Sequence, residues 1–322
     1  MTPVRILVTG ALGYMGQHLS QALQLRNDVE LHGTYRTARH HSLSQRMTLH
    51  HIDLCGQLPT TDLINQVQPE QIYHLAGNIQ ASRGIDRRDP AAERDNFGAT
   101  LNLYRACLRL TKLPMIVFAS TGAVYGQSAG IMTETLPLKP LNAYAASKAT
   151  ADMFSSRCWV EDGLPVIRAR LFNYLGPGQD EQTAMSRFAH ELARLERSNA
   201  APAILNVGNL DAERDFTDIA DLVRALTLLM ERGEPGEAYN VASGISHPMR
   251  WYLDELIKQV RIPVEVRTDP TLLRTAETQR LQVDISKLQA LTGWKPTVPL
   301  HQTLAAMMET CRTAVAKEGQ SR

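Results

Sequence analysis

Tyr144 and Lys148 are the residues whose types and spacing point most directly to chemistry. They lie in the segment Tyr-Ala-Ala-Ser-Lys, within a predicted helix of about residues 143 to 160. Four residues apart on a helix, their side chains lie one turn apart on one face. A free phenol has a pKa of about 10, and a neighbouring ammonium favours the phenolate. We therefore predict proton transfer by Tyr144 with Lys148 beside it; the alternative is an exposed helix face.

A glycine-rich segment near the N-terminus is the second candidate site. The apolar run Arg5–Val8 leads into Thr-Gly-Ala-Leu-Gly-Tyr-Met-Gly, residues 9–16, where an amphipathic helix begins. Glycines allow a tight turn and let backbone N–H groups approach a pyrophosphate at the positive end of the helix. Because the spacing is Gly-x-x-Gly-x-x-Gly, the prediction depends on this position between strand and helix. The alternative is a tight turn without a ligand. The predicted dinucleotide contacts are Gly10, Gly13, Tyr14, Met15 and Gly16.

The end of the second predicted strand, Val29–Thr34, distinguishes NAD from NADP. An acidic residue there would bind the adenosine 2′-hydroxyl, whereas an arginine suits a 2′-phosphate. The strand is followed by Tyr35 and Arg36, then by Arg39, and no carboxylate occurs before Asp53. We therefore expect Tyr35, Arg36 and Arg39 to bind the cofactor, with NADP(H) favoured over NAD(H). The alternative is that the arginines belong to a solvated loop.

Further cofactor contacts are expected where the next strands end. Asp53, followed by Leu54, could accept a hydrogen bond from the adenine amino group, or it could only cap the next turn. Small residues after the fourth strand would let a dinucleotide lie against the backbone. The predicted contacts of this group are Asp53, Leu54, Leu75, Ala76, Gly77 and Leu171.

Thr121 follows the fifth predicted strand, at the sheet edge where the cofactor is expected. Its hydroxyl could hydrogen-bond a reacting carbonyl oxygen beside Tyr144. Nearby Tyr125 is expected to pack against its own loop.

The elements that position these residues are short apolar runs that alternate with helical patterns. This alternation predicts an α/β fold with a Rossmann-type, doubly wound parallel sheet. Helices are expected around Met15–Leu23, from Asp89 to about Leu110, and from Ala143 to Val160. The predicted strands are Arg5–Val8, Val29–Thr34, Met47–Asp53, Gln71–Leu75, Met115–Ala119 and Val166–Arg170.

The pattern changes after Arg170, where a turn-rich stretch indicates a crossing into a second, smaller α/β domain. We predict a dinucleotide-binding domain over residues 1–172 and a substrate domain over residues 173–322. Residues 214–242 contain a helix at Ile219–Arg232 and a strand at Ala238–Val241, which are expected to return to the first domain. The second half should also contain a helix near Thr183–Glu196 and a strand near Ile204–Val207.

Composition argues against several classes of function. The net charge is +1 and the pI is about 7.8, so no global field attracts nucleic acid or a membrane surface. The four cysteines are far apart and form no Cys-x-x-Cys pair, which predicts neither a metal site nor disulfides. With no signal-peptide pattern and no apolar run of about 18 residues, we expect a cytoplasmic protein.

Three motifs in this order resemble the extended short-chain dehydrogenase/reductase family. They are Gly-x-x-Gly-x-x-Gly, Thr-x-x-Val-Tyr-Gly at residues 121–126 and Tyr-x-x-x-Lys at residues 144–148. The resemblance covers nearly the whole chain. It implies Thr121, Tyr144 and Lys148 as the catalytic set, with Lys148 also holding the nicotinamide ribose, and a nucleotide-linked sugar in the C-terminal domain. It also implies a homodimer, formed through the helices near Asp95–Leu110 and Ala143–Val160.

Segments of the second half are similar to the GDP-sugar members of this family. These segments are residues 171–179, 207–218, 274–277 and 293–296. By that resemblance, Asn173 and Arg214 face the diphosphate, while Arg274 and Glu277 face the nucleoside. Arginine suits phosphate through its fixed fork of donors, and a glutamate can accept from a ribose diol or a guanine N–H edge. The alternative role is in ion pairs that stabilise the domain. The full predicted substrate set is Thr121, Asn173, Arg187, Val207, Asn209, Arg214, Arg274 and Glu277.

Two positions depart from the family pattern. Dehydratases of the family carry an acidic residue shortly after the catalytic threonine, where this chain has Gly122 and Ala123, so dehydration is not expected. Thr275 stands where a proline is usual in Arg-Pro-x-Glu. The preferred interpretation is NADPH-dependent reduction of the 4-keto group of a GDP-linked 4-keto-6-deoxy sugar. A nucleotide-sugar 4-epimerase and a non-catalytic NADP-binding sensor or scaffold remain the alternatives.

Overall fold

A seven-stranded sheet forms the centre of the larger part of the molecule. In the computed structural model, which describes residues 2–37, 46–78, 91–127, 130–198, 202–273 and 281–318, its strand order is β10-β6-β5-β4-β1-β2-β3. Every pairing in this sheet is parallel. The predicted fold class is thereby confirmed. The strands are β1 (Val4–Thr9), β2 (Val29–Tyr35), β3 (Thr48–His51), β4 (Gln71–His74), β5 (Met115–Thr121), β6 (Val166–Leu171) and β10 (Ala238–Val241).

The central strands are buried on both faces, which explains why they read as continuous apolar runs. Successive side chains of a strand point to opposite faces. Ile6 and Val8 of β1 therefore belong to one hydrophobic core, while Leu7 between them belongs to another.

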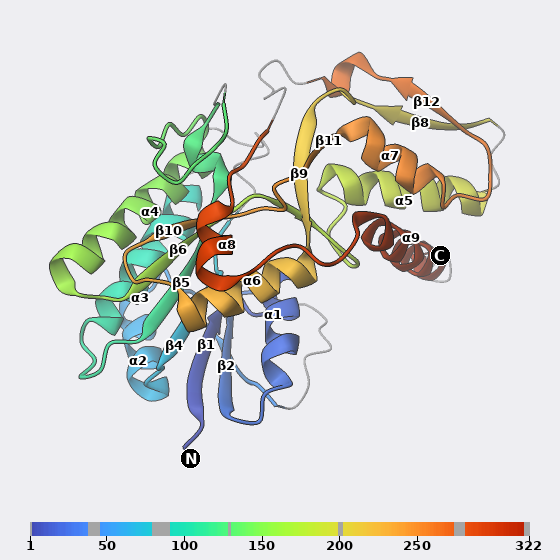
Figure 1. The fold of residues 1–322 in the computed structure, drawn as a ribbon. Helices are drawn as coiled ribbons and strands as arrows, with labels where there is room; N and C mark the ends of the chain where they lie inside the picture. Colours follow the sequence, from blue (N-terminus) through green and yellow to red (C-terminus); the bar gives the residue numbers. More distant parts are fainter. Residues whose placement is uncertain are drawn as a thin grey trace.

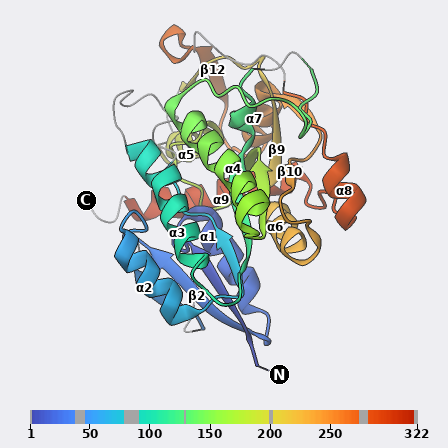
Figure 2. The ribbon, with the colours of Figure 1, turned by 90° about the vertical axis from the view of Figure 1, so that its left-hand side faces the viewer.

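Helices cover both faces of this sheet (Figures 1 and 2). Leu19 and Leu23 of α1 pack with α6 residues such as Leu222 in one core. Leu103 and Tyr104 of α3 and Ala151 of α4 pack in the other. The helices of the first face are α1 (Tyr14–Gln24), α6 (Ile219–Arg232) and α8 (Ser286–Thr292), and those of the second are α2 (Gln57–Val67), α3 (Ala99–Cys107) and α4 (Ala143–Asp162).

The helix expected from Asp89 to Leu110 differs from the prediction. Residues 79–90, including the expected start, lie outside the described residues. The described part begins with a π-helical segment, η2 (Glu93–Gly98), before α3. The wider turn buries two consecutive polar residues, Asp95 and Asn96. Such π-helical turns are frequent at functional sites, and periodicity in the sequence does not reveal them.

The rest of the chain builds a smaller part with its own core, at the right of Figure 1. Met185 and Phe188 of α5 pack there against Leu304 and Met307 of α9. Its strands are β7 (Asn173–Leu175), β8 (Ala203–Val207), β9 (Glu213–Asp218), β11 (Ser246–Pro248) and β12 (Val264–Thr268), in sheets ordered β11-β9-β7 and β12-β8. Its helices are α5 (Ala184–Ser198), α7 (Met249–Ile257) and α9 (Leu300–Glu318).

Two elements of the second half lie against the large sheet. β10 pairs with β6, and α6 packs on the sheet beside α1. The exact division of the chain at residue 172 remains a prediction.

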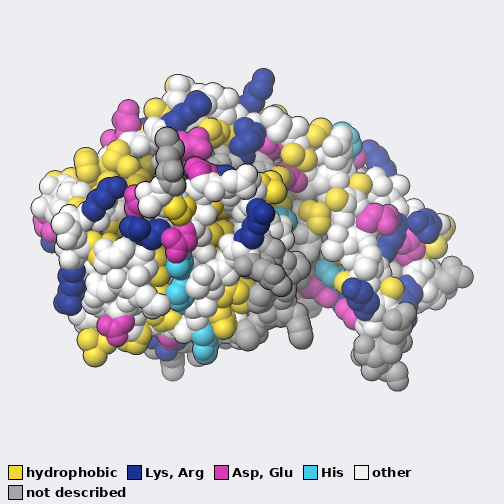
Figure 3. Space-filling view, turned by 90° about the horizontal axis from the view of Figure 1, so that it is seen from below, with side chains coloured by type: hydrophobic (Ala, Val, Ile, Leu, Met, Phe, Trp, Pro, Cys, Tyr) yellow, Lys and Arg dark blue, Asp and Glu magenta, His cyan; other side chains and the backbone are white. Residues whose placement is uncertain are grey.

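On the face shown in Figure 3, positive and negative side chains are interspersed. No helix in the described ranges is long and apolar enough to cross a membrane. Within the same ranges, no three His, Cys, Asp or Glu side chains are placed to hold a metal ion.

Candidate active site

The glycine loop lies where the strand order reverses, between the carboxyl ends of β1 and β4. Gly10 has a φ of +69°, and a Cβ on it would lie 3.0 Å from the backbone of Ala76. A Cβ on Gly16 would lie 2.2 Å from the carbonyl oxygen of Gly10. Side chains at these two positions would therefore push the loop away from β4 and from the helix. This reversal point is where open α/β sheets bind dinucleotides.

The N-terminus of α1 is suited to an anion. Gly13 precedes the helix and provides no side-chain cap, and the first turn of α1 has no acidic residue. The first N–H groups of an α-helix have no partner within the helix and carry its positive dipole end. The predicted pyrophosphate contacts at Tyr14 and Met15 lie at this terminus, so the residues present fit a dinucleotide.

A buried hydrogen-bond chain ties β1, β4 and α3 together beneath this loop. The Thr9 hydroxyl is 2.8 Å from His74 Nδ1 and accepts from the Ala76 backbone N–H at 3.1 Å. The other ring nitrogen of His74 is 2.9 Å from the Thr100 hydroxyl. Burial, with Lys148 adding to it, lowers the pKa of His74 to about 3, so the ring is neutral. Apart from the position of His74 at a strand end, no sequence pattern predicts these hydrogen bonds.

Tyr144 lies in the first turn of α4, at the same edge of the sheet. The Asn142 side chain begins that helix by accepting from the Ala145 N–H at 2.8 Å. The Thr121 hydroxyl, at the end of β5, lies close enough to Tyr144 to lower the pKa of its phenol. The prediction that Tyr144 and Thr121 act together requires this proximity, and the structure has it. Burial raises the pKa of Tyr144 and outweighs the lowering by Thr121, so the phenol is protonated at neutral pH.

Lys148 lies one turn further along α4, and its side chain is buried. Its Nζ is 4.4 Å from the centroid of the Phe118 ring. The same atom is 3.9 Å from the place that a Cβ on Gly77 would take, so the ammonium reaches the loop after β4. Burial lowers the pKa of Lys148 to about 8, opposed by the negative charge of Asp152. Because this pKa is close to neutral pH, small changes in the surroundings of Lys148 change its protonation.

Asn96 is a residue of this site that the sequence did not reveal. Its Oδ1 accepts from the Asn78 backbone N–H at 2.8 Å, and its Nδ2 donates to Ser147 Oγ at 2.9 Å. Asn96 thus connects the loop after β4 to Ser147 of α4, the residue that precedes Lys148. A Cβ on Gly77 would lie 2.7 Å from Asn96 Oδ1, which explains why glycine is needed there.

Arg36 lies at the end of β2 as predicted, but an acidic residue lies beside it. Its Nη1 is 2.8 Å from Asp95 Oδ1, and its Nη2 donates to Asp95 Oδ2 at 3.0 Å. Asp95 comes from η2, so the residues around the strand end do not predict it. The Tyr35 ring stacks on His51 at 5.1 Å. Arg39 lies outside the described residues.

The remaining predicted cofactor contacts fall along the same edge. Asp53 accepts from the Cys55 N–H at 3.0 Å and so caps the turn that follows β3. Leu171 ends β6 and pairs in register with Thr121 of β5. Leu54 is buried, whereas Gly77 is exposed and Leu75 and Ala76 are half-buried.

Of the predicted substrate residues, the structure brings two to neighbouring strands. Asn173 begins β7, which pairs with β9, the strand that holds Arg214. The Asn173 amide donates to the Asp215 carbonyl at 3.3 Å, and Arg214 Nη1 donates to the Glu213 carbonyl at 2.8 Å. Arg274 and Glu277 lie outside the described residues.

The other three predicted substrate residues lie on separate elements. Arg187, on α5, is 3.8 Å from the Glu191 carboxylate on the next turn, which fits the alternative of an ion pair. Val207 is buried at the end of β8. Asn209 accepts from the Asp211 N–H at 3.0 Å.

The sheet, its glycine loop and the Thr121, Tyr144 and Lys148 set define an extended short-chain dehydrogenase/reductase, as the motifs predicted. A family model described as GDP-mannose 4,6 dehydratase matches residues 7–307. The chain belongs to this family.

Individual relatives span almost the entire chain. It is 32% identical to GDP-6-deoxy-D-mannose reductase of Pseudomonas aeruginosa over 98% of this chain and 99% of that protein. It is similar to the solved structure of RMD from Pseudomonas aeruginosa complexed with NADPH, with 30% identity, a TM-score of 0.83, and 97% and 99% of the two chains covered. It is also similar to UDP-glucose 4-epimerase of Thermus thermophilus in complex with NAD, with 25% identity, a TM-score of 0.83, and 97% and 100% covered.

Proposed function

We propose that this protein reduces the 4-keto group of a GDP-linked 4-keto-6-deoxy sugar with NADPH. The observation that carries the proposal is the meeting of Thr121, Tyr144 and Lys148 at the dinucleotide edge of the sheet. The full-length similarity to a GDP-6-deoxy-D-mannose reductase supports the choice of substrate.

Each catalytic residue has a separate task in this reaction. The nicotinamide, when bound, supplies a hydride for the keto carbon. Tyr144 donates its phenolic proton to the carbonyl oxygen, and its raised pKa keeps that proton available at neutral pH. The Thr121 hydroxyl, which lies beside Tyr144, donates its one hydrogen to the same oxygen. Lys148 holds the nicotinamide ribose and stabilises the phenolate that Tyr144 becomes.

Position 122 argues against a dehydratase. A Cβ on Gly122 would lie 2.5 Å from the Phe172 ring, so an acidic side chain there requires Phe172 to move. The next residue, Ala123, is not acidic either. The Gly-Ala pair also suits a sugar 4-epimerase, which keeps its cofactor and needs no external reductant.

A turnover assay with NADPH and a GDP-4-keto-6-deoxy sugar tests the proposal. We expect NADPH consumption and a 4-hydroxy sugar product. Tyr144→Phe removes one hydroxyl and little volume, so turnover should fall by about 10²–10⁴ while NADPH binding is retained. Tyr73→Phe, at a buried tyrosine of β4 outside the catalytic set, is the matched control.

The other outcomes of this assay separate the alternatives. Interconversion of 4-epimers without consumption of NADPH would establish the epimerase. Binding of NADPH without turnover of any nucleotide sugar would establish the sensor or scaffold. Full activity of Tyr144→Phe would contradict the role of Tyr144.

We further propose a homodimer formed through α4 and α3. Met153 and Val160 of α4 are 62% and 77% exposed, and Trp159 is 38% exposed. These apolar side chains suit an interface better than water. Sedimentation at micromolar concentration should give about twice the 35.8 kDa chain mass. A monomer at that concentration would contradict the dimer.

A further inference from the structure

Two arginines and one buried carboxylate meet at the edge of the sheet where the adenosine end of the cofactor is expected. Arg36 comes from the end of β2, while Arg94 and Asp95 come from η2. Besides the Arg36 contacts, Asp95 Oδ1 accepts from Arg94 Nε at 3.0 Å and lies 2.9 Å from Arg94 Nη2. Asp95 Oδ2 accepts from the Asn78 amide at 3.0 Å. We call Arg36, Arg94, Asp95 and Asn78 the arginine cluster.

Asp95 is not placed to act as the acid that binds a ribose 2′-hydroxyl. Its side chain is 4% exposed, and both oxygens already accept hydrogen bonds from the cluster. Burial alone would raise the pKa of Asp95, but hydrogen bonds from Arg36, Arg94 and Asn78 bring the pKa below its ordinary value. Asp95 is therefore a carboxylate enclosed by donors, without a lone pair directed to solvent for a sugar hydroxyl.

The two arginines, in contrast, keep donors for a ligand. A guanidinium has five N–H donors. Arg36 uses Nη1 and Nη2 on Asp95, and Arg94 uses Nε and Nη2. Their side chains are 47% and 59% exposed, so the remaining donors reach the surface. One carboxylate thus fixes two guanidinium groups side by side, an arrangement that suits an anion with several oxygens.

We propose that Arg94 is a second anchor for the 2′-phosphate of NADPH, and that Asp95 is the positioning residue that holds Arg94 and Arg36 for it. The inference rests on the proposed NADPH dependence. It adds a residue 58 positions from Arg36 in sequence, which the strand-end rule cannot find. Because the two side chains are fixed before binding, less conformational entropy is lost when they bind the phosphate.

The test uses two small probes that differ only in the 2′-phosphate, adenosine 2′,5′-bisphosphate and adenosine 5′-monophosphate. Their Kd values are measured by calorimetry, which needs neither substrate nor turnover. Arg94→Ala should weaken the bisphosphate about tenfold or more, the effect of a charge-assisted contact, and the monophosphate less than twofold. Arg36→Ala should behave in the same way. Arg105→Ala, an exposed arginine about three turns further along the helix, is the control and should change neither Kd.

The outcomes separate this inference from the proposed function. Equal affinity of the unmutated protein for both probes would overturn the NADPH preference and the inference together. Loss of the preference in Arg36→Ala with its retention in Arg94→Ala would overturn only the role of Arg94. An equal loss for both probes in Arg94→Ala would mean a structural role and would also overturn it.

Asp95→Asn tests the positioning role. The amide keeps the size of the side chain but has no negative charge and only one accepting oxygen, so it cannot bind both guanidinium groups as the carboxylate does. We expect the preference for the bisphosphate to fall several-fold, with unchanged monophosphate binding as evidence that the site is folded. A higher preference for the bisphosphate would show that Asp95 competes with the phosphate, which would overturn this role.

Discussion

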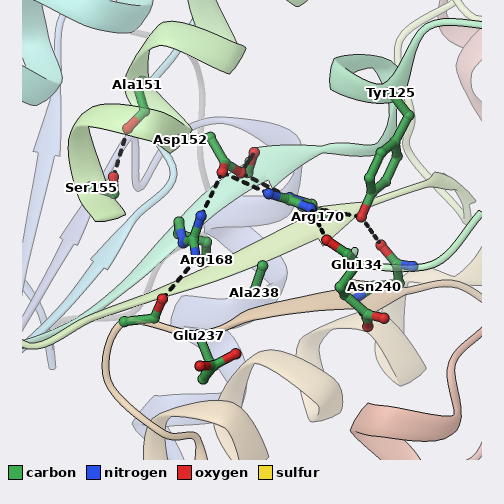
Figure 4. A network of polar contacts seen from close by, with 12 residues as sticks. Tyr125, Glu134, Ala151, Asp152, Ser155, Arg168, Arg170, Glu237, Ala238 and Asn240 are labelled. Atoms are coloured by element: carbon green, nitrogen blue, oxygen red, sulfur yellow. Dashed lines mark hydrogen bonds and ion pairs between the residues drawn. The ribbon is translucent and has the colours of Figure 1, made fainter. Parts of the chain in front are cut away.

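In two places in this molecule, a pair of arginines binds one aspartate, and the two places differ in how exposed the arginines are to water. In the network of Figure 4, Asp152 of α4 is fully buried and bonds Arg168 and Arg170 of β6 at 3.0 and 2.9 Å. Those arginine side chains are 14% and 5% exposed. In the arginine cluster, the Asp95 side chain is also buried, at 4% exposed against 0% for Asp152, but its two arginines are about half-exposed. The same ion-pair chemistry is internal in one place and open in the other.

The difference separates support from binding. Arg170 uses its remaining donors on the Tyr125 hydroxyl and the Glu134 carbonyl, at 2.9 and 3.1 Å, so it offers little to a ligand. The Ser120 hydroxyl also donates to Asp152 at 2.6 Å, next to Thr121. This network therefore fixes α4 and β5, which hold the catalytic residues. The arginine cluster leaves its donors at the surface.

The largest expected effect is on stability, from removal of the buried aspartate. Asp152→Ala leaves Arg168 and Arg170 inside the protein without their counter-charge. An uncompensated buried charge costs about 3–5 kcal/mol. Asp95→Ala should cost much less, because its arginines regain water. The urea midpoint of unfolding checks both variants, with Asp28→Ala, in an exposed pair with Arg26, as the control. Equal losses for Asp152→Ala and Asp95→Ala would remove the distinction between the two groups.

A second prediction concerns Lys148, whose pKa is lowered by burial and raised by the negative charge of Asp152. Its pKa of about 8 means that the ammonium is lost as pH rises through that value. We expect kcat/KM for reduction to fall above about pH 8, by up to about tenfold per pH unit. Lys148→Arg stays charged throughout this range, so the fall should move to higher pH even if the absolute rate is lower. The same pH profile in both proteins would contradict the assignment of the fall in kcat/KM to Lys148.

The sequence predicted the sheet well because its strands are apolar runs that are buried on both faces. It also placed Tyr144, Lys148 and Thr121 on neighbouring elements, since parallel strands bring their carboxyl ends to one edge. It did not predict Asp95 beside Arg36 or Asn96 beside Ser147, because those contacts join residues 59 and 51 positions apart. They also depend on η2, whose widened turn leaves no periodic signature. Local patterns predicted the elements, and packing decided which polar side chains meet.

The smallest expected effect tests a third kind of buried group, one that is kept neutral instead of paired. His74 has a pKa of about 3 in the folded protein, well below its ordinary value. The unfolded chain binds a proton on this ring at higher pH than the folded protein does, so stability is lost as pH falls from about 6.5 towards 3. The loss is at most about 1.4 kcal/mol per pH unit and is smaller near pH 6.5. His74→Gln can still hydrogen-bond Thr9 and Thr100 but does not titrate, so its unfolding midpoint should fall less steeply between pH 6.5 and 5. His301→Gln, at an exposed position, is the control. An unchanged slope in His74→Gln would mean that the ring takes up its proton without unfolding, and the hydrogen-bond chain beneath the glycine loop would then tolerate a charge.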